Sequence, residues 1–182
     1  MGSLTVSASL LAVIAAAMLA ETARSARNVR RLRARGASEV DDGVYRWMAI
    51  VYPASFLAMA AEGFAVGPPP PWVQAAGVAV FVAGKALKYA AIASLGPLWS
   101  FRVLVLPGEP LVRSGPYRLM RHPNYVGVMG ELVGTAIAMG AIVAGPVALV
   151  TFGFLLKRRV AAEERALGLA ARGGSRPSHR DG

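Results

Sequence analysis

The sequence predicts an all-α, polytopic integral membrane protein of about five transmembrane helices, the last two forming a helical hairpin. The first observation behind this is composition: 55% of the 182 residues are hydrophobic and 16% are charged, whereas a soluble domain usually carries about 25% charged residues. The second is a series of long apolar stretches. The third is that arginine is confined to alternate connections between those stretches.

Five apolar stretches account for the predicted helices. A helix needs roughly 20 apolar residues to cross a bilayer core, with a range of about 17 to 25. The last two stretches are short and share a tight turn at 144–146, so we expect them to form one hairpin. The stretches are Leu4–Ala20, Tyr45–Val66, Trp72–Ser94, Asn124–Ile142, and a last one that begins at Val143 or Pro146 and ends at Leu156.

The basic residues predict an orientation. Six arginines fill the first connection and four fill the third, whereas the second and fourth connections hold none and the tail is again basic. Because cytoplasmic connections are enriched in Lys and Arg, we expect the N-terminus outside and the C-terminus in the cytoplasm. This alternation explains the net charge of +10 without a nucleic-acid partner. No basic residue precedes the first apolar stretch, so we expect an uncleaved helix there rather than a signal peptide.

One polar segment, GPYRLMRHPNY at 115–125, interrupts the apolar sequence. Pro123 disfavours helical geometry at the preceding His122 and suits the first turn of a following helix. The N–H groups at that helix start favour an anion such as a carboxylate. Tyr117 and Tyr125 offer ring faces suited to a stacked base, and Arg121 supplies positive charge.

A second polar segment, LKRRVAAEERAL at 156–167, is predicted on the same cytoplasmic side. The two ends of a helical hairpin meet on one side, so Glu163 and Glu164 would face the first segment as acceptors for hydroxyl or ammonium groups. The residues alone leave an alternative open. Arg and Tyr at a membrane boundary are commonly interfacial anchors, and the glutamates would then belong to a solvated helix face.

The combined pattern GPYRLMRHPNYVG, then a helical hairpin, then paired glutamates, resembles the isoprenylcysteine carboxyl methyltransferase family. It also resembles the wider group of small integral-membrane methyltransferases that includes phospholipid methyltransferases. The resemblance covers roughly residues 85–167 and is closest to small bacterial members, which implies the inner (plasma) membrane of a bacterium. It implies S-adenosyl-L-methionine as cofactor, with a pocket formed by Tyr117, Arg121, His122, Pro123, Asn124, Tyr125, Glu163 and Glu164. No metal is expected.

Glu131 lies about two turns into the fourth predicted helix, where an unpaired carboxylate costs about 2.5 kcal/mol or more. We expect such a residue to face the bundle interior, and one hypothesis places it in an acceptor pocket below the cofactor methyl group. Arg121 or Arg158 would orient a carboxylate acceptor. The alternative is a structural ion pair of Glu131 with Lys85 or Lys88. Gly130 and Gly134 form a small-residue pair that predicts close helix packing.

The sequence therefore predicts a membrane-embedded methyltransferase domain at 1–169 and a disordered cytoplasmic tail at 170–182. The expected reaction is O-methylation of a carboxyl or hydroxyl group on a lipophilic, isoprenoid- or polyketide-like acceptor, which reaches the site from the bilayer. Three alternatives stay open at this point: a phospholipid N-methyltransferase, a small proton-coupled transporter that uses Glu131, and a lipid-surface binder that uses the arginines of the first connection.

Overall fold

The computed structural model describes residues 2–168, so the predicted disordered tail at 170–182 lies outside the described residues. Helices dominate this part of the chain, which confirms the all-α prediction. The elements in chain order are helix α1 (Gly2–Ala34), strand β1 (Ser38–Val40), helices α2 (Tyr45–Val66) and α3 (Pro71–Leu95), the 3-10 turn η1 (Gly96–Leu98), strand β2 (Val103–Val105), the 3-10 turn η2 (Gly115–Arg118), and helices α4 (Pro123–Met139) and α5 (Ala144–Ala166).

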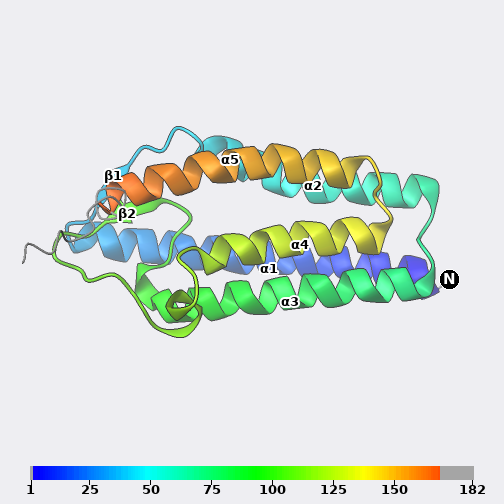
Figure 1. Cartoon of the computed structure of the whole chain (residues 1–182), viewed down its shortest axis with the longest axis horizontal. Helices are drawn as coiled ribbons and strands as arrows, with labels where there is room; N and C mark the ends of the chain where they lie inside the picture. The colour runs from blue at the N-terminus through cyan, green and yellow to red at the C-terminus, as the bar shows by residue number, and fades with distance from the viewer. Residues whose placement is uncertain (1, 169–182) are drawn as a thin grey trace, which may run out of the picture.

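The long helices lie side by side along one axis (Figure 1). One end of the bundle carries the N-terminus, the α2–α3 turn and the α4–α5 turn. The opposite end carries β1, β2 and the last turns of α1 and α5. At the first end, Gly140 terminates α4 in the left-handed region, with φ 67°, and α5 then runs back beside α4 (Figure 1). The starts of α4 and the end of α5 therefore lie at the same end of the bundle.

Glu62 of α2 holds the start of α5 in place. Its carboxylate accepts hydrogen bonds from the backbone N–H of Val143 at 3.0 Å and of Ala144 at 2.6 Å. These N–H groups have no partner inside α5, and an acidic group is favoured at the positive end of a helix dipole. This contact joins α2 to the α4–α5 turn.

Helix α1 is longer than the predicted apolar stretch Leu4–Ala20. The arginine-rich segment, expected to be a loop, continues the helix to Ala34, so that part of the prediction is wrong. Arg, Ala and Leu have high helix propensity, and a stripe of buried side chains continues along the segment through Glu21, Asn28 and Leu32. Propensity and burial together therefore extend the helix past the end of the apolar run.

Helix α5 likewise continues past Leu156 and carries the paired glutamates on its last turns. Within residues 2–168, the helices α1, α2 and α3 are long and apolar enough to cross a membrane. Helix α4 has 17 residues, and α5 is apolar in its first half and charged in its second. The chain has the character of an integral membrane protein, and the number of crossings stays a prediction.

Helices α3 and α4 pack backbone against backbone. A Cβ atom added at Gly134 of α4 would lie 2.3 Å from the backbone nitrogen of Phe81, and one added at Gly84 of α3 would lie 2.8 Å from that of Glu131. A Cβ atom added at Gly130 would lie 3.1 Å from the Cα atom of Gly84. The predicted close packing at Gly130 and Gly134 is thus confirmed. Small residues allow this approach between membrane helices, which gain packing contacts rather than hydrophobic burial from it.

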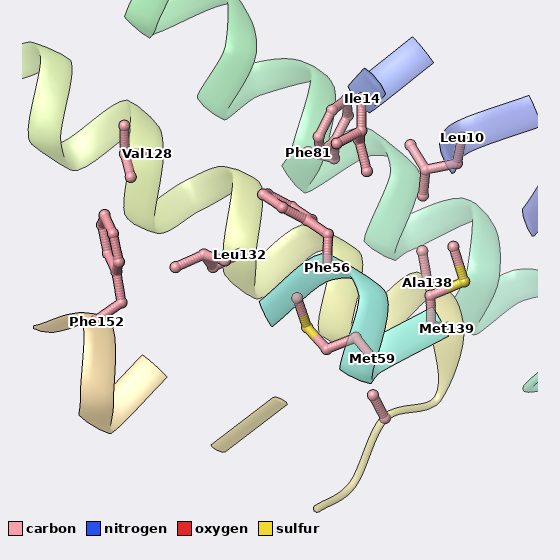
Figure 2. Close-up of a cluster of buried hydrophobic side chains, with 11 residues drawn as sticks. Leu10, Ile14, Phe56, Met59, Phe81, Val128, Leu132, Ala138, Met139 and Phe152 are labelled. Carbon is pink, nitrogen blue, oxygen red and sulfur yellow. The ribbon is translucent and has the colours of Figure 1, made fainter. Parts of the chain in front are cut away.

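An apolar cluster joins all five described helices (Figure 2). Phe56 and Met59 of α2 belong to this cluster, as do Leu132 of α4 and Phe152 of α5. Phe81 of α3 packs near α1 in this cluster. The cluster is therefore the apolar core that the five helices share.

Candidate active site

A cavity of ≈ 800 Å³ opens at the end of the bundle that carries the two strands. Its wall comes from the end of α1, the chain from Leu95 to Arg113 that includes β2, the turn η2, the start of α4 and the end of α5. Strand β1 pairs antiparallel with β2, with Glu39 opposite Leu104, and fixes that part of the wall. The predicted site residues that line the cavity are Tyr117, Arg121, His122, Asn124, Tyr125 and Glu163.

The start of α4 and the end of α5 meet directly at this cavity. The Tyr125 hydroxyl donates to Oε2 of Glu163 at 2.6 Å, and Nε2 of His122 lies 3.1 Å from Oε1 of Glu164. Arg121 reaches the same Glu164 oxygen at 3.7 Å. The two polar segments, about 40 residues apart in sequence, are thus neighbours in space.

The local geometry of α4 explains how these side chains reach the cavity. The helix begins at Pro123, and His122 before it has φ −128° and ψ 56°, outside the helical region, as the sequence predicted. The rings of His122 and Tyr125 stack with centroids 5.6 Å apart. Among the described residues, no side-chain hydrogen bond caps this helix start. Oδ1 of Asn124 is buried and has no hydrogen-bond partner within residues 2–168, so it can accept from a donor on a bound molecule.

Tyr117 lies on η2, half-buried against the same cavity. Burial, and then the negative charge of Glu163, raise the pKa of its hydroxyl above the ordinary value. The phenol therefore stays protonated at neutral pH. It offers a hydrogen-bond donor and an aromatic face to the cavity, both without charge.

Arg158 and Arg159 of α5 have opposite environments. Arg158 is exposed and is not part of the cavity wall. Arg159 is 5% exposed, donates to the Tyr125 hydroxyl at 3.2 Å and to the carbonyl oxygen of Phe101 at 2.6 Å, and forms an ion pair with Asp42. The sequence reasoning selected Arg158 and missed Arg159. The missing signal was helical spacing, because a residue four positions before Glu163 shares its face.

Glu131 lies elsewhere, in a buried group of charges inside the bundle. It is 1% exposed, pairs with Nζ of Lys85 at 2.8 Å and of Lys88 at 3.4 Å, and accepts from the Tyr52 hydroxyl at 2.6 Å. Glu21 of α1 pairs with Lys88 at 2.6 Å and with Lys85 at 3.3 Å. The ion pair that the sequence left as an alternative is therefore present, and Glu131 is absent from the wall of the large cavity.

The sequence did not lead us to expect Glu21 or Tyr52 in this group. Glu21 directly follows the first apolar stretch, so it reads as the start of the polar connection. Because α1 continues as a helix, that position stays inside the bundle, where Glu21 is 3% exposed. Its spacing of seven residues from Ile14, which is also buried, was the available signal, since positions seven apart share a helix face.

Comparison with known proteins shows to which family the chain belongs. Residues 77–169 match the isoprenylcysteine carboxyl methyltransferase (ICMT) family. The uncharacterized protein YpbQ of Bacillus subtilis (strain 168) is 31% identical over 160 residues, which cover 87% of this chain and 94% of that protein. An uncharacterized protein of Haemophilus influenzae is 28% identical over 50% of this chain and 54% of its own length.

A plant enzyme is also similar. Protein-S-isoprenylcysteine O-methyltransferase A of Arabidopsis thaliana is 33% identical over 48% of this chain and 43% of its own length. No solved structure gives a significant match. The matched region contains the start of α4, the end of α5 and the cavity wall between them. The chain therefore belongs to the isoprenylcysteine carboxyl methyltransferase family of membrane methyltransferases.

Proposed function

We propose that this chain transfers a methyl group from S-adenosyl-L-methionine to a carboxyl or hydroxyl group of a lipophilic acceptor, at the cytoplasmic face of a bacterial membrane. The observation that carries the proposal is the meeting of His122 and Tyr125 with Glu163 and Glu164 at the mouth of a cavity of ≈ 800 Å³. Family membership supplies the reaction class.

The cavity wall fits the chemical groups of this cofactor. The uncapped start of α4 and the guanidinium of Arg121 suit the methionine carboxylate. Glu163 suits a ribose hydroxyl or the ammonium group, and the unpartnered Oδ1 of Asn124 suits an amino group. Tyr117 supplies a neutral aromatic face for the adenine. When bound, S-adenosyl-L-methionine would supply an electrophilic methyl group on a positively charged sulfur.

The chain's own residues would mainly bind and align. Methyl transfer is a displacement in line with the departing sulfur, so holding both reactants in that geometry supplies much of the rate. Arg159 lines the cavity and makes three polar contacts that fix its position. We assign to Arg159, in place of the exposed Arg158, the role of orienting an acceptor carboxylate.

The acceptor class rests on the family rather than on Glu131. An unpaired Glu131 in the acceptor pocket could act as a base for an acceptor hydroxyl, and it would then favour O-methylation. Glu131 instead has two lysine partners and a tyrosine donor, so that argument no longer supports the choice. The family is named for carboxyl methylation of isoprenylcysteine, and the plant relative is named as an O-methyltransferase of protein-S-isoprenylcysteine. Both names favour an O-methylated lipophilic acceptor.

Isothermal calorimetry with S-adenosylhomocysteine tests the cofactor assignment. The purified full chain in detergent is expected to bind this product with a micromolar Kd. Arg158→Gln provides a matched control, because it removes an exposed charge on the same helix and is expected to leave the Kd unchanged. Absence of binding by the wild-type chain would contradict the proposal.

Incubation with labelled S-adenosyl-L-methionine and a lipid extract of the source organism tests the acceptor. Mass analysis is expected to show a methyl ester or methyl ether on a lipophilic molecule. A methylated amine on a phospholipid headgroup would instead establish the N-methyltransferase alternative and contradict O-methylation.

A further inference from the structure

Helix α1 lies outside the family-matched region at 77–169, yet it contacts the wall of the cavity. Leu32 on its last turns is 3% exposed and lines the cavity directly. Asn28 and Ser25 precede Leu32 on the same buried stripe, each 5% exposed. Their spacings of three and four residues place the three side chains on one helix face. That face is turned toward the segment that follows α3.

Asn28 fixes the point where the chain leaves α3. Its Nδ2 donates to the carbonyl oxygens of Gly96 at 3.1 Å and of Trp99 at 2.7 Å. The carbonyl oxygen of Gly96 also accepts from the backbone N–H of Trp99 at 3.4 Å, so the amide of Asn28 adds a second donor there and supplies a donor to the carbonyl oxygen of Trp99. Trp99 is 3% exposed and is part of the cavity wall. Asn28 thus holds one wall residue in place through its backbone.

Ser25 begins a continuous set of hydrogen bonds that ends at the candidate site. Its Oγ accepts from the backbone N–H of Phe101 at 2.9 Å, and the carbonyl oxygen of Phe101 accepts from Arg159 at 2.6 Å. Arg159 donates to the Tyr125 hydroxyl at 3.2 Å, and that hydroxyl donates to Glu163 at 2.6 Å. Ser25 on α1 is therefore linked to Glu163 on α5 through hydrogen bonds by way of Phe101, Arg159 and Tyr125.

We propose that Asn28 and Ser25 are positioning residues of the binding site. Their hydrogen bonds hold the segment Gly96–Phe101 in position. The carbonyl oxygen of Phe101 in turn holds Arg159 where it can contact Tyr125, the residue that binds Glu163. The ligand part of this inference rests on the proposed function, whereas the positioning of Trp99 does not. Helix α1 accordingly helps to position the wall of the binding site.

The test compares Asn28→Leu with Gln74→Leu in the full chain. Leucine is close in shape to asparagine and lacks its donors. Gln74 is an equally suitable buried amide, 4% exposed, which donates to Ser7 Oγ and to the carbonyl oxygen of Ser3 on the early part of α1, each at 3.1 Å. Asn28→Leu loses a polar contact of α1 with the segment after α3, and Gln74→Leu loses a polar contact of α1 with α3. Both variants are expected to lower the Tm in detergent. Only Asn28→Leu is expected to raise the Kd for S-adenosylhomocysteine, by roughly tenfold.

Equal Kd values for Asn28→Leu and the wild-type chain would overturn the inference, and so would an equal rise in Kd for Gln74→Leu. If Asn28→Leu does not fold, Ser25→Ala serves as the smaller change, with an expected rise of about threefold. Asparagine-to-glutamine substitution at position 28 retains the donors and is expected to recover part of the affinity.

Fluorescence separates failure of this inference from failure of the proposed function. The chain has three tryptophans, of which Trp47 and Trp72 are exposed and Trp99 is buried. In a Trp47→Phe/Trp72→Phe background, the emission reports on Trp99 without any ligand. Asn28→Leu is expected to shift that emission to longer wavelength, and Gln74→Leu is not. If the wild-type chain binds no S-adenosylhomocysteine, the proposed function fails, and the Trp99 emission alone then tests the positioning role of Asn28. An unchanged emission spectrum in Asn28→Leu would overturn that role.

Discussion

The molecule contains two groups of charged and polar side chains, one of which is buried and paired within itself, whereas the other borders a cavity. The bundle cluster, formed by Glu21, Lys85, Lys88 and Glu131, has two acids and two bases, and every one of these side chains has at most 11% of its surface exposed. The mouth cluster consists of the cavity-lining residues His122, Tyr125, Arg159 and Glu163, together with Glu164, which contacts His122. The first cluster pairs with itself, whereas the second faces open space.

This difference teaches what each cluster can do. The charges of the bundle cluster pair with one another across α1, α3 and α4. Oε1 of Glu131 makes no hydrogen bond within residues 2–168 and has Nζ of Lys88 at 3.4 Å as its ionic partner. The low polarity around these groups makes the loss of a partner costly. Such a group specifies which helices dock and in which register. Glu163 of the mouth cluster lines the cavity, as does Asn124, whose Oδ1 has no hydrogen-bond partner among residues 2–168. It can therefore exchange protein contacts for contacts with a bound molecule.

The largest expected effect comes from breaking the bundle cluster on one side. Glu131→Leu leaves two lysines facing Glu21 alone, and loss of one partner of a buried ion pair costs about 3–5 kcal/mol. We expect a large loss of folded protein, measured by thermal unfolding in detergent. The double variant Glu131→Leu/Lys85→Leu restores charge balance and is expected to recover much of that stability.

Glu131→Gln sharpens the same comparison. If the bundle cluster is structural, the turnover per folded molecule stays near the wild-type value. Loss of turnover with S-adenosylhomocysteine binding intact would instead support the catalytic role that the sequence suggested for Glu131.

An intermediate effect is expected in the mouth cluster from Glu163→Gln. The charged acceptor of Tyr125 becomes neutral, and hydrogen bonds to charged groups contribute about 1.5–3 kcal/mol. We expect the Kd for S-adenosylhomocysteine to rise by about 10- to 100-fold, with a change in Tm much smaller than that of Glu131→Leu. Calorimetry and thermal unfolding on the same sample check both parts. A loss of stability comparable to that of Glu131→Leu would remove the distinction between the two clusters.

The smallest effect is expected at Glu39 of β1, on the outer side of the mouth. A hydrogen bond from Arg102, with a second from Arg33 and despite partial burial, lowers the pKa of Glu39 below its ordinary value of 4.5. A lowered pKa means that the ionised form stabilises the fold above that ordinary value, and that the contribution is lost as the pH falls through the folded-state value. Thermal unfolding from pH 7 to pH 3 is expected to show a small loss on the acid side, which Glu39→Gln removes. An unchanged acid-side loss in that variant would assign it to other carboxylates.

Much of the fold follows from local sequence. The second predicted helix has the bounds observed for α2, Tyr45–Val66, because Gly and Pro follow it directly and an apolar run of that length has few other folds. The start of α4 at Pro123 follows from proline's fixed geometry. The small residues at Gly130 and Gly134 predicted close packing, since only glycine leaves space for a neighbouring backbone.

The sequence by itself therefore determined the helical membrane class, the bend at His122 and the residue types gathered in the polar segments. The tertiary structure decided which faces of the helices meet. It buried Arg159 at the cavity wall and left Arg158 exposed. It also paired Glu131 with lysines and brought Glu21 and Asn28 of α1 into the interior. The physical reason is that spacing along a helix fixes which side chains share a face, whereas the rotation of that face toward a cavity, a neighbouring helix or lipid depends on packing contacts from distant parts of the chain.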